Sequence, residues 1–222
     1  MSLQIDIVSD VVCPWCFIGK RHLDQALAVY QQRYPDSPVP GVRWHPFQLN
    51  PRLPASGIPR AEYTATKFGG PERAKEVYAR VAAAGAKAGI GFAFDRIEVQ
   101  PNTIDAHRLL HRAAELGIQH AMAESLFSGY FLEGRNLTDR DTLGELAQRA
   151  GMSAGEAKRY LDSDEDRTLI TQQDEHARRM GVEGVPFFIF NQRLAVSGAQ
   201  PAEILLDAME RAEASTETAA AQ

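Results

Sequence analysis

The sequence predicts an α/β fold in which the strands come from the two ends of the chain and a helical block lies between them. Two observations carry this prediction. Residues 3–47 show strand, helix and strand patterns in turn, and residues 164–214 show helix, strand, strand and helix patterns. From about residue 60 to residue 161, apolar side chains recur almost throughout at helical spacing.

The first three elements are short and sharply bounded. Leu3 to Val8 is rich in β-branched residues, stops at Ser9 and Asp10, and is typical of a strand. A helix is indicated next by apolar residues at helical spacing, namely Phe17, Leu23, Ala26, Leu27 and Tyr30. Several prolines end this helix after residues 31–34. Residues 42–47 alternate apolar with polar side chains, which predicts a second strand.

The middle of the chain predicts a series of helices. Glycines, prolines and N-cap residues divide it into helical segments near residues 62–68, 71–88, 103–117, 119–134, 138–150 and 154–160. The segment 89–94 fits either a turn or a short extended stretch. Asn102 or Thr103 is expected to cap the helix that follows Pro101.

The C-terminal part returns to a mixed pattern. It predicts a helix at 164–180, a buried strand at 187–190, a hairpin partner at 194–196, and a last helix after Pro201. We expect antiparallel pairing in this hairpin and parallel pairing elsewhere in the sheet. The element order predicts a thioredoxin-like domain formed by residues 1–55 plus 164–214. Residues 56–163 then form a helical insertion domain, and residues 215–222 form a frayed tail.

Both cysteines of the 222-residue chain, Cys13 and Cys16, lie at the turn between the first strand and the first helix. Pro14 fits the first helical position, where a missing N–H does no harm. The unpaired N–H groups of the first turn and the helix dipole favour a thiolate at Cys13. Cys16 lies on the same helix face, within reach of a disulfide. We predict that Cys13 is the exposed attacking thiol and Cys16 the shielded resolving thiol.

Half of a zinc site is the alternative interpretation of these cysteines. A structural zinc ion needs four ligands, and the chain holds no second cysteine pair. His107 and His111 stand four residues apart on one predicted helix, but no glutamate follows His107, so the metalloprotease pattern is absent. A Cys-x-x-Cys pair next to a β-α-β pattern instead indicates redox chemistry. We therefore expect no metal.

Composition and charge narrow the function classes. The chain has 44% hydrophobic and 24% charged residues and a net charge of −5, which argues against nucleic acid and anionic membrane as partners. No apolar stretch approaches the length of a membrane span. The first residues carry neither a basic segment nor an apolar one typical of a signal peptide. We expect a cytoplasmic protein.

Four motifs together resemble the DsbA-like thioredoxin superfamily, in particular its FrnE-type thiol-disulfide oxidoreductases. They are Asp10-x-x-Cys13-Pro14-Trp15-Cys16-x-x-Gly19, Pro101-Asn102-Thr103 with Ala106-His107-Arg108, Gly184-Val185-Pro186, and Val196-Ser-Gly198-Ala199-Gln200. The resemblance extends over nearly the whole chain. It implies a DsbA-like fold, that is, a thioredoxin fold with a large all-helical insertion.

The same resemblance implies roles for two further residues. Pro186 is expected to be a cis-proline facing the dithiol, and the backbone of Val185 to pair with an extended substrate segment beside Cys13. The chain departs from its periplasmic, strongly oxidising relatives in having Pro-Trp rather than Pro-His between the cysteines. We expect a less oxidising couple for that reason.

Other residues near the motifs allow more than one interpretation. Asp10 caps the turn or handles a proton during resolution of a mixed disulfide. Trp15 and Phe17 form an apolar landing surface, that is, a surface that contacts substrate, unless Phe17 belongs to the core. Asn102 and His107 line the active-site cleft, or the histidine is simply packed or solvated.

The leading functional hypothesis is a cytoplasmic protein disulfide oxidoreductase or isomerase. Its substrates are protein or small-molecule disulfides and dithiols, with no cofactor other than glutathione as a candidate co-substrate, and it acts as a monomer or homodimer. One alternative is a glutathione-dependent isomerase or transferase of the 2-hydroxychromene-2-carboxylate isomerase or kappa-class type. Another is a non-enzymatic chaperone or binding module.

Overall fold

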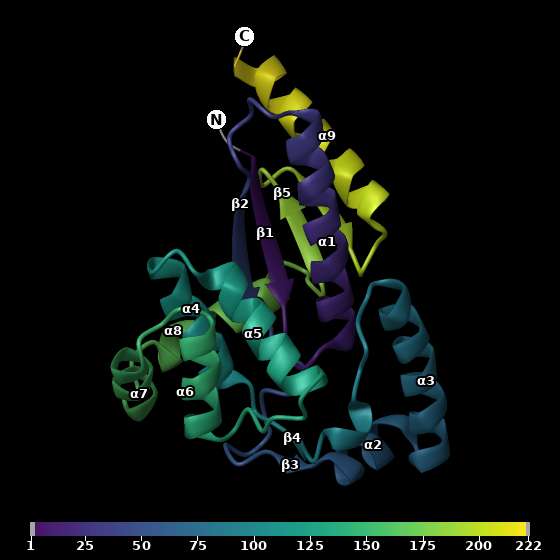
Figure 1. Cartoon of the computed structure of the whole chain (residues 1–222), viewed down its shortest axis with the longest axis vertical. Coiled ribbons are helices and arrows are strands. Elements are labelled where there is room, and N and C mark those ends of the chain that lie inside the picture. Colours follow the sequence, from purple (N-terminus) through teal and green to yellow (C-terminus); the bar gives the residue numbers. More distant parts are fainter. Residues whose placement is uncertain (1–2, 221–222) are drawn as a thin grey trace.

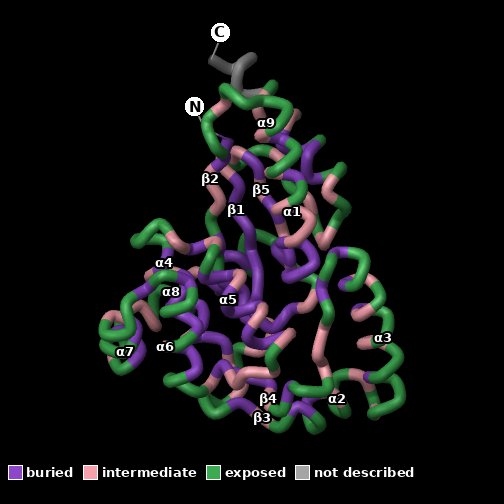
Figure 2. The backbone as a smooth tube through the Cα atoms, viewed as in Figure 1, coloured by how far each residue is buried: buried purple, intermediate pink, exposed green. Residues whose placement is uncertain are grey.

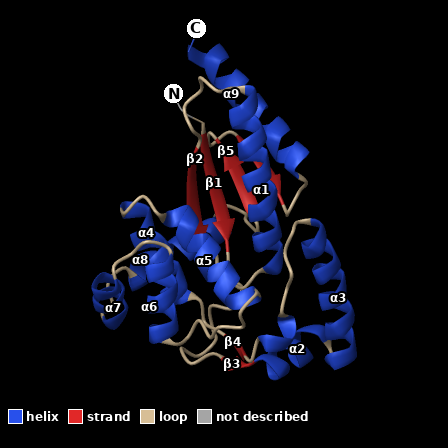
Figure 3. Ribbon diagram, viewed as in Figure 1, coloured by secondary structure: helices blue, strands red, loops and turns tan. Residues whose placement is uncertain are grey.

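A four-stranded sheet forms the centre of the molecule (Figure 1, Figure 3). The computed structural model describes residues 3–220, and their side chains as far as residue 214. The strand order is β2-β1-β5-β6. The strands are β1 (Gln4–Ser9), β2 (Gly41–Pro46), β5 (Phe187–Phe190) and β6 (Leu194–Ser197).

The sheet is mixed, but its pairing differs in one place from the prediction. β1 and β2 are parallel and the β5–β6 hairpin is antiparallel, as expected. The pair β1–β5 is also antiparallel, with Val8 opposite Phe187, so parallel pairing outside the hairpin was wrong there. The reason is where β5 begins. β1 runs toward the dithiol turn, whereas β5 starts beside that turn, directly after Pro186, and therefore runs away from it.

Two helices from opposite ends of the chain pack together. They are α1 (Pro14–Arg33) and α9 (Ala202–Ala220), which lie side by side along the sheet (Figure 1). A third helix, α8 (Arg167–Arg179), contacts β2. The expected frayed tail, 215–222, lies outside the residues whose side chains are described, and the α9 backbone continues there to Ala220.

The insertion contains the helices that the sequence predicts. They are α2 (Arg60–Phe68), α3 (Pro71–Lys87), α4 (Ile104–Glu115), α5 (Gln119–Phe131), α6 (Arg140–Arg149) and α7 (Ala154–Asp162), with a short 3-10 turn, η1 (Phe94–Arg96). It is not all-helical, however. Two-residue strands β3 (Ile58–Pro59) and β4 (Val99–Gln100) pair antiparallel at its base. Strands this short leave no alternating pattern, so the sequence could not reveal them.

One hydrophobic core runs through the thioredoxin-like part and the insertion. Phe17 of α1 is fully buried and stacks on Phe127 of α5, with ring centroids 5.2 Å apart. Figure 2 shows buried residues along both β1 and α5. Phe17 is therefore a core residue and not part of a landing surface. The helix that carries the cysteines is anchored by the insertion.

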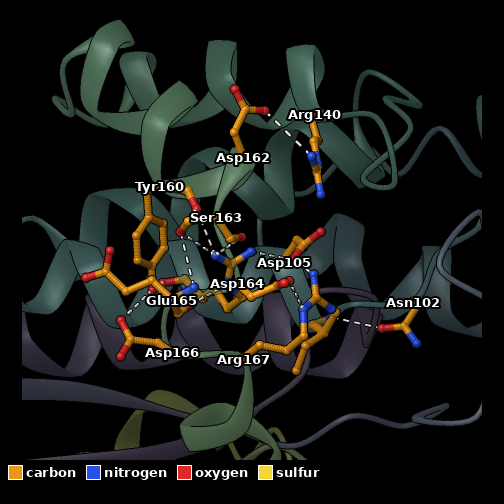
Figure 4. Close-up of polar contacts among 12 residues, drawn as sticks. Asn102, Asp105, Arg140, Tyr160, Asp162, Ser163, Asp164, Glu165, Asp166 and Arg167 are labelled. Atoms are coloured by element: carbon orange, nitrogen blue, oxygen red, sulfur yellow. Dashed lines mark hydrogen bonds and ion pairs between the residues drawn. The ribbon is translucent and has the colours of Figure 1, made fainter.

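The segment between α7 and α8, where the chain leaves the insertion, is fixed by polar contacts (Figure 4). Arg108 of α4 is fully buried. Its guanidinium donates to the carbonyl oxygens of Tyr160 at 2.7 Å, Ser163 at 2.8 Å and Glu165 at 2.7 Å. In Figure 4, Arg167 also donates to Asp105 at 2.8 Å. Because this turn uses residues 163–166, the helix predicted from residue 164 begins at Arg167.

Candidate active site

The dithiol lies at the end of β1, where the chain turns into α1. The backbone N–H of Cys13 donates to the carbonyl of Asp10 at 3.0 Å, which closes the turn. Cys13 is the N-cap residue of α1, with extended backbone angles, and Pro14 occupies the first helical turn. Both placements confirm the prediction. The Cys13 side chain makes no cap hydrogen bond, Pro14 has no N–H, and the Cys16 N–H donates to the Cys13 carbonyl at 3.0 Å.

The two thiols differ in burial, although less than expected. Cys16 is 1% exposed, and Cys13 is 5% exposed. The prediction of an exposed Cys13 was wrong, because both thiols are buried; only the order of their burial agrees with it. Burial raises the pKa of Cys16 well above its ordinary value, and the hydrogen bond and charge of neighbouring Cys13 raise it further. Cys16 therefore holds its proton at neutral pH in the dithiol form.

The loop at Pro186 covers Cys13, which explains the low exposure of that thiol. The Val185–Pro186 peptide bond is cis, as the resemblance implied. The Cys13 thiol lies 3.5 Å from the carbonyl oxygen of Val185, to which it donates. On the other side of the loop, the N–H of Gly198 donates to the Pro186 carbonyl at 2.9 Å. The third and fourth sequence motifs thus meet the first at the dithiol.

Gly19 makes this close approach possible. A Cβ atom at this position of α1 would lie 2.9 Å from Cγ of Pro186 and 3.1 Å from Cζ of Phe188. Both distances are shorter than normal carbon–carbon contacts. The glycine three positions after the Cys-x-x-Cys pair is therefore required by packing against the cis-proline loop.

Asp10 forms a buried pair with His107 of α4. Its carboxylate accepts from the backbone N–H of Leu49 at 2.7 Å and lies 3.2 Å from Nε2 of His107. Asp10 is 0% exposed and His107 is 2% exposed. The interpretation of the Asp10 side chain as a cap of the turn was therefore wrong, because this side chain points into the interior and binds Leu49 and His107. His107 does not line an open cleft, for the same reason.

The remaining candidates have structural partners. His111 lies 3.9 Å from Asp166, so the two predicted histidines of α4 have different partners. Asn102 accepts from Ile104 N–H at 3.0 Å and donates to the Leu53 carbonyl at 2.8 Å, which joins α4 to the loop after β2. Within the described residues, no group of three or more His, Cys, Asp or Glu side chains could hold a metal ion.

Trp15, between the two cysteines, is 43% exposed and forms one end of a groove of about 500 Å³. The groove lies between α1, α3 and the turn before α9, and its lining includes Arg80 and Lys87 of α3. The prediction of Trp15 as a surface residue beside the thiols agrees with this exposure. Sequence reasoning missed the two cations. The available signal was their spacing of seven residues, which places them on one face of an alanine-rich helix.

Comparison with known proteins agrees with this geometry. The model of the DSBA-like thioredoxin domain family matches residues 4–210. The crystal structure of the probable DsbA oxidoreductase SCO1869 from Streptomyces coelicolor is 30% identical, with a TM-score of 0.85 over 96% of this chain and 90% of that one. The uncharacterized protein YwbO of Bacillus subtilis is 26% identical over 90% of this chain and 92% of its own.

A more distant solved structure shares the fold. It is the cytosolic disulfide reductase DsbM from Pseudomonas aeruginosa with GSH, at 19% identity and a TM-score of 0.61, covering 99% of this chain and 100% of that one. None of the described helices is long and apolar enough to cross a membrane. The match to the family model over nearly the whole chain, together with the dithiol and the cis-proline, shows that this chain belongs to the DSBA-like thioredoxin domain family.

Proposed function

We propose that this protein exchanges disulfides through Cys13 and Cys16, with Cys13 as the attacking thiol. The supporting observation is the placement of Cys13 at the start of α1, 3.5 Å from the cis-proline loop, with a more deeply buried thiol one turn further on. Membership of the DSBA-like family supports thiol-disulfide oxidoreductase activity in general. The division of labour between the two cysteines is our inference from burial.

The reaction has two exchange steps. The Cys13 thiolate attacks one sulfur of a substrate disulfide, so that a mixed disulfide forms and the other substrate sulfur leaves as a thiolate that takes up a proton. Cys16 then loses its proton and attacks the Cys13 sulfur. This breaks the mixed disulfide, releases the second substrate thiol, and leaves a Cys13–Cys16 disulfide. A thiol reductant, for which glutathione is the candidate, returns the pair to the dithiol. Run in reverse, the same steps oxidise a substrate dithiol.

The neighbouring residues support these steps in different ways. Pro14 begins the helix at whose N-terminus Cys13 lies, and Trp15 offers an exposed aromatic surface for substrate. In our proposal the Val185 backbone, whose carbonyl lies 3.5 Å from the Cys13 thiol, pairs with an extended substrate segment. Asp10 and His107 hold the turn against α4, and they are the buried polar groups through which the Cys16 proton is handled in our proposal.

We further propose that the protein works as a reductase or isomerase in the cytoplasm. The Pro-Trp dipeptide places no histidine between the cysteines that could stabilise the thiolate, which favours a less oxidising couple. The fold is shared with a solved structure named a cytosolic disulfide reductase and containing GSH. Protein or small-molecule disulfides are the expected substrates, and we propose a monomer or homodimer.

Reduction of a peptide disulfide by glutathione, with and without the protein, tests this proposal. Activity should disappear in Cys13→Ser. In Cys16→Ser turnover should fall sharply, and a mixed disulfide on Cys13 should accumulate. Wild-type activity at background would contradict the enzymatic proposal and would favour a chaperone or binding module. Isomerase activity on a small molecule that survives Cys16→Ser would favour the glutathione-dependent isomerase or transferase.

A further inference from the structure

The groove beside Trp15 is close to the dithiol along the chain, although neither cysteine lines it. Trp15 stands between the two cysteines, and His22, two turns further along α1, lies at the groove too. The opposite wall is α3, which stands next to the first half of α1 (Figure 1). The third side is the turn with Ala199 and Pro201. That turn is bound to the cis-proline loop through Gly198, so one short segment joins the groove to the loop beside Cys13.

All charged or titratable side chains that line this groove are basic. They are Arg80 and Lys87 of α3 and His22 of α1, and no aspartate or glutamate lines it. The chain as a whole carries a net charge of −5, so a groove lined by basic side chains alone differs in charge from the rest of the protein. His22 is tied through Nδ1 to the carbonyl of Gln200 at 2.8 Å. Arg80 and Lys87 are exposed.

Among the described residues, Arg80 and Lys87 also lack the ion pairs that the cations of α1 form with a carboxylate. Lys20 and Arg21 contact Glu124 at 2.9 Å and 2.6 Å. In the part of the chain that the structure describes, neither Arg80 nor Lys87 has a carboxylate within ion-pair distance. Arg80 makes only a long contact, 3.4 Å, with the backbone carbonyl of Glu76. Their charge is available to a partner.

The dimensions of the groove fit a short stretch of polypeptide. Trp15 to His22 and Arg80 to Lys87 each span seven residues, which on a helix is about 10 Å. An extended chain covers that length with about three residues. Small side chains, Ala83 and Ala84, lie between the two cations of α3 and leave the space open.

We propose that this groove binds an acidic segment of a polypeptide substrate, next to the cysteine that exchanges with Cys13. The substrate carboxylates lie between Arg80 and Lys87, and an apolar part of the segment lies on Trp15. This inference deepens the proposed thiol–disulfide exchange and rests on it. It makes acidic disulfide-bonded polypeptides the preferred class of substrate.

The test compares two disulfide-containing peptides that differ only in having glutamates or glutamines beside the cysteine. Wild-type protein should favour the glutamate peptide in kcat/KM by about 5-fold or more at low salt, with the preference shrinking as salt rises. In the double variant Arg80→Glu/Lys87→Glu the preference should disappear or reverse. The control, Arg73→Glu/Lys75→Glu, changes the net charge equally on the same helix but outside the groove lining, and should keep the wild-type preference.

Two further measurements separate this proposal from the proposed function. Turnover of a small uncharged disulfide should be the same in both double variants. If the wild type does not turn over this disulfide, the proposed exchange chemistry is contradicted, and the proposal for the groove is not. Binding of the cysteine-free glutamate peptide to Cys13→Ser/Cys16→Ser protein tests the groove without any exchange. It is followed by the change in tryptophan fluorescence, to which the exposed Trp15 should contribute and the buried Trp44 should not. Equal binding of the glutamate and glutamine peptides would overturn the proposal. If Arg80→Glu/Lys87→Glu raises only the KM for glutathione, the proposal is also overturned, because the groove would then bind glutathione and not a polypeptide.

Discussion

The carboxylate of Asp10 lies 3.2 Å from Nε2 of His107, and this contact joins the dithiol turn to helix α4 of the insertion. Both side chains are almost completely excluded from solvent. A buried carboxylate is tolerated only where its oxygens are hydrogen-bonded. Here one oxygen accepts from Leu49 N–H and the other faces His107. The insertion is therefore part of the active-site support.

Asp10→Ala should lower the free energy of unfolding by about 2 kcal/mol or more, because it leaves the Leu49 N–H and His107 without their buried acceptor. Urea unfolding of the reduced protein measures this. Asp36→Ala, which removes an exposed aspartate, is the control and should stay within about 0.5 kcal/mol of the wild type. Equal stability of the two variants would show that the pair does not hold the turn.

Cys16 should make the stability of the reduced protein pH-dependent in the alkaline range. Burial raises the pKa of this thiol, so the folded protein keeps a proton that the unfolded chain loses above about pH 8.5. The contribution of Cys16 to stability is thus complete below that pH and is lost as the pH rises toward the pKa of the folded state. The slope reaches about 1.4 kcal/mol per pH unit.

Urea unfolding at a series of pH values, with a phosphine reductant present, checks this expectation. Cys16→Ser removes the titrating thiol and should show a shallower fall over the same range. The comparison cancels the contribution of the tyrosines, which titrate in both proteins. Parallel curves for the wild type and Cys16→Ser would contradict the raised pKa.

Gly19→Ala should destabilise the protein although it places a better helix former in a helix. The added methyl group would lie 2.9 Å from Pro186 and 3.1 Å from Phe188, and such overpacking costs about 1–3 kcal/mol. Exchange activity should fall with it, because the cis-proline loop must shift. Gly144→Ala in α6 is the matched control, since no atom lies within 4 Å of the added group. It should stabilise by up to about 1 kcal/mol. Similar effects of the two substitutions would contradict the packing requirement at Gly19.

Arg108→Met should loosen the segment between α7 and α8. Methionine fills a similar space but removes the Arg108 donor from the carbonyl oxygens of Ser163 and Glu165 and breaks the ion pair with Asp105, at a cost of about 3 kcal/mol or more. The Tyr160 carbonyl still accepts from Ser163. Hydrogen exchange should become faster in residues 160–167. Arg112→Met, on the same helix, removes only partly exposed ion pairs with Glu115 and Glu156 and should change stability by less than about 1 kcal/mol. Unchanged exchange in this segment of Arg108→Met would refute the structural role of the arginine.

Local patterns were enough to predict most elements and the centre of the site. These patterns depend on residues close together in the chain: the alternation in strands, the spacing in helices, and the position of Pro14. They were enough to predict Cys13 at the start of α1 and Cys16 one turn later. The cis-proline was predicted from the resemblance of its motif, because no local pattern distinguishes it.

The tertiary structure decided how these local elements face one another. Three features depend on contacts between residues far apart in sequence. They are the direction of β5, the burial of Cys13 under the Val185–Pro186 loop, and the pairing of Asp10 with His107. The groove likewise needs α1 and α3 to stand side by side. The sequence by itself determined which residues form the dithiol at the start of a helix. The packing of the Val185–Pro186 loop over Cys13 determined how buried that dithiol is, and α3 of the insertion determined which charges lie near it, because burial and electrostatics depend on neighbours in space.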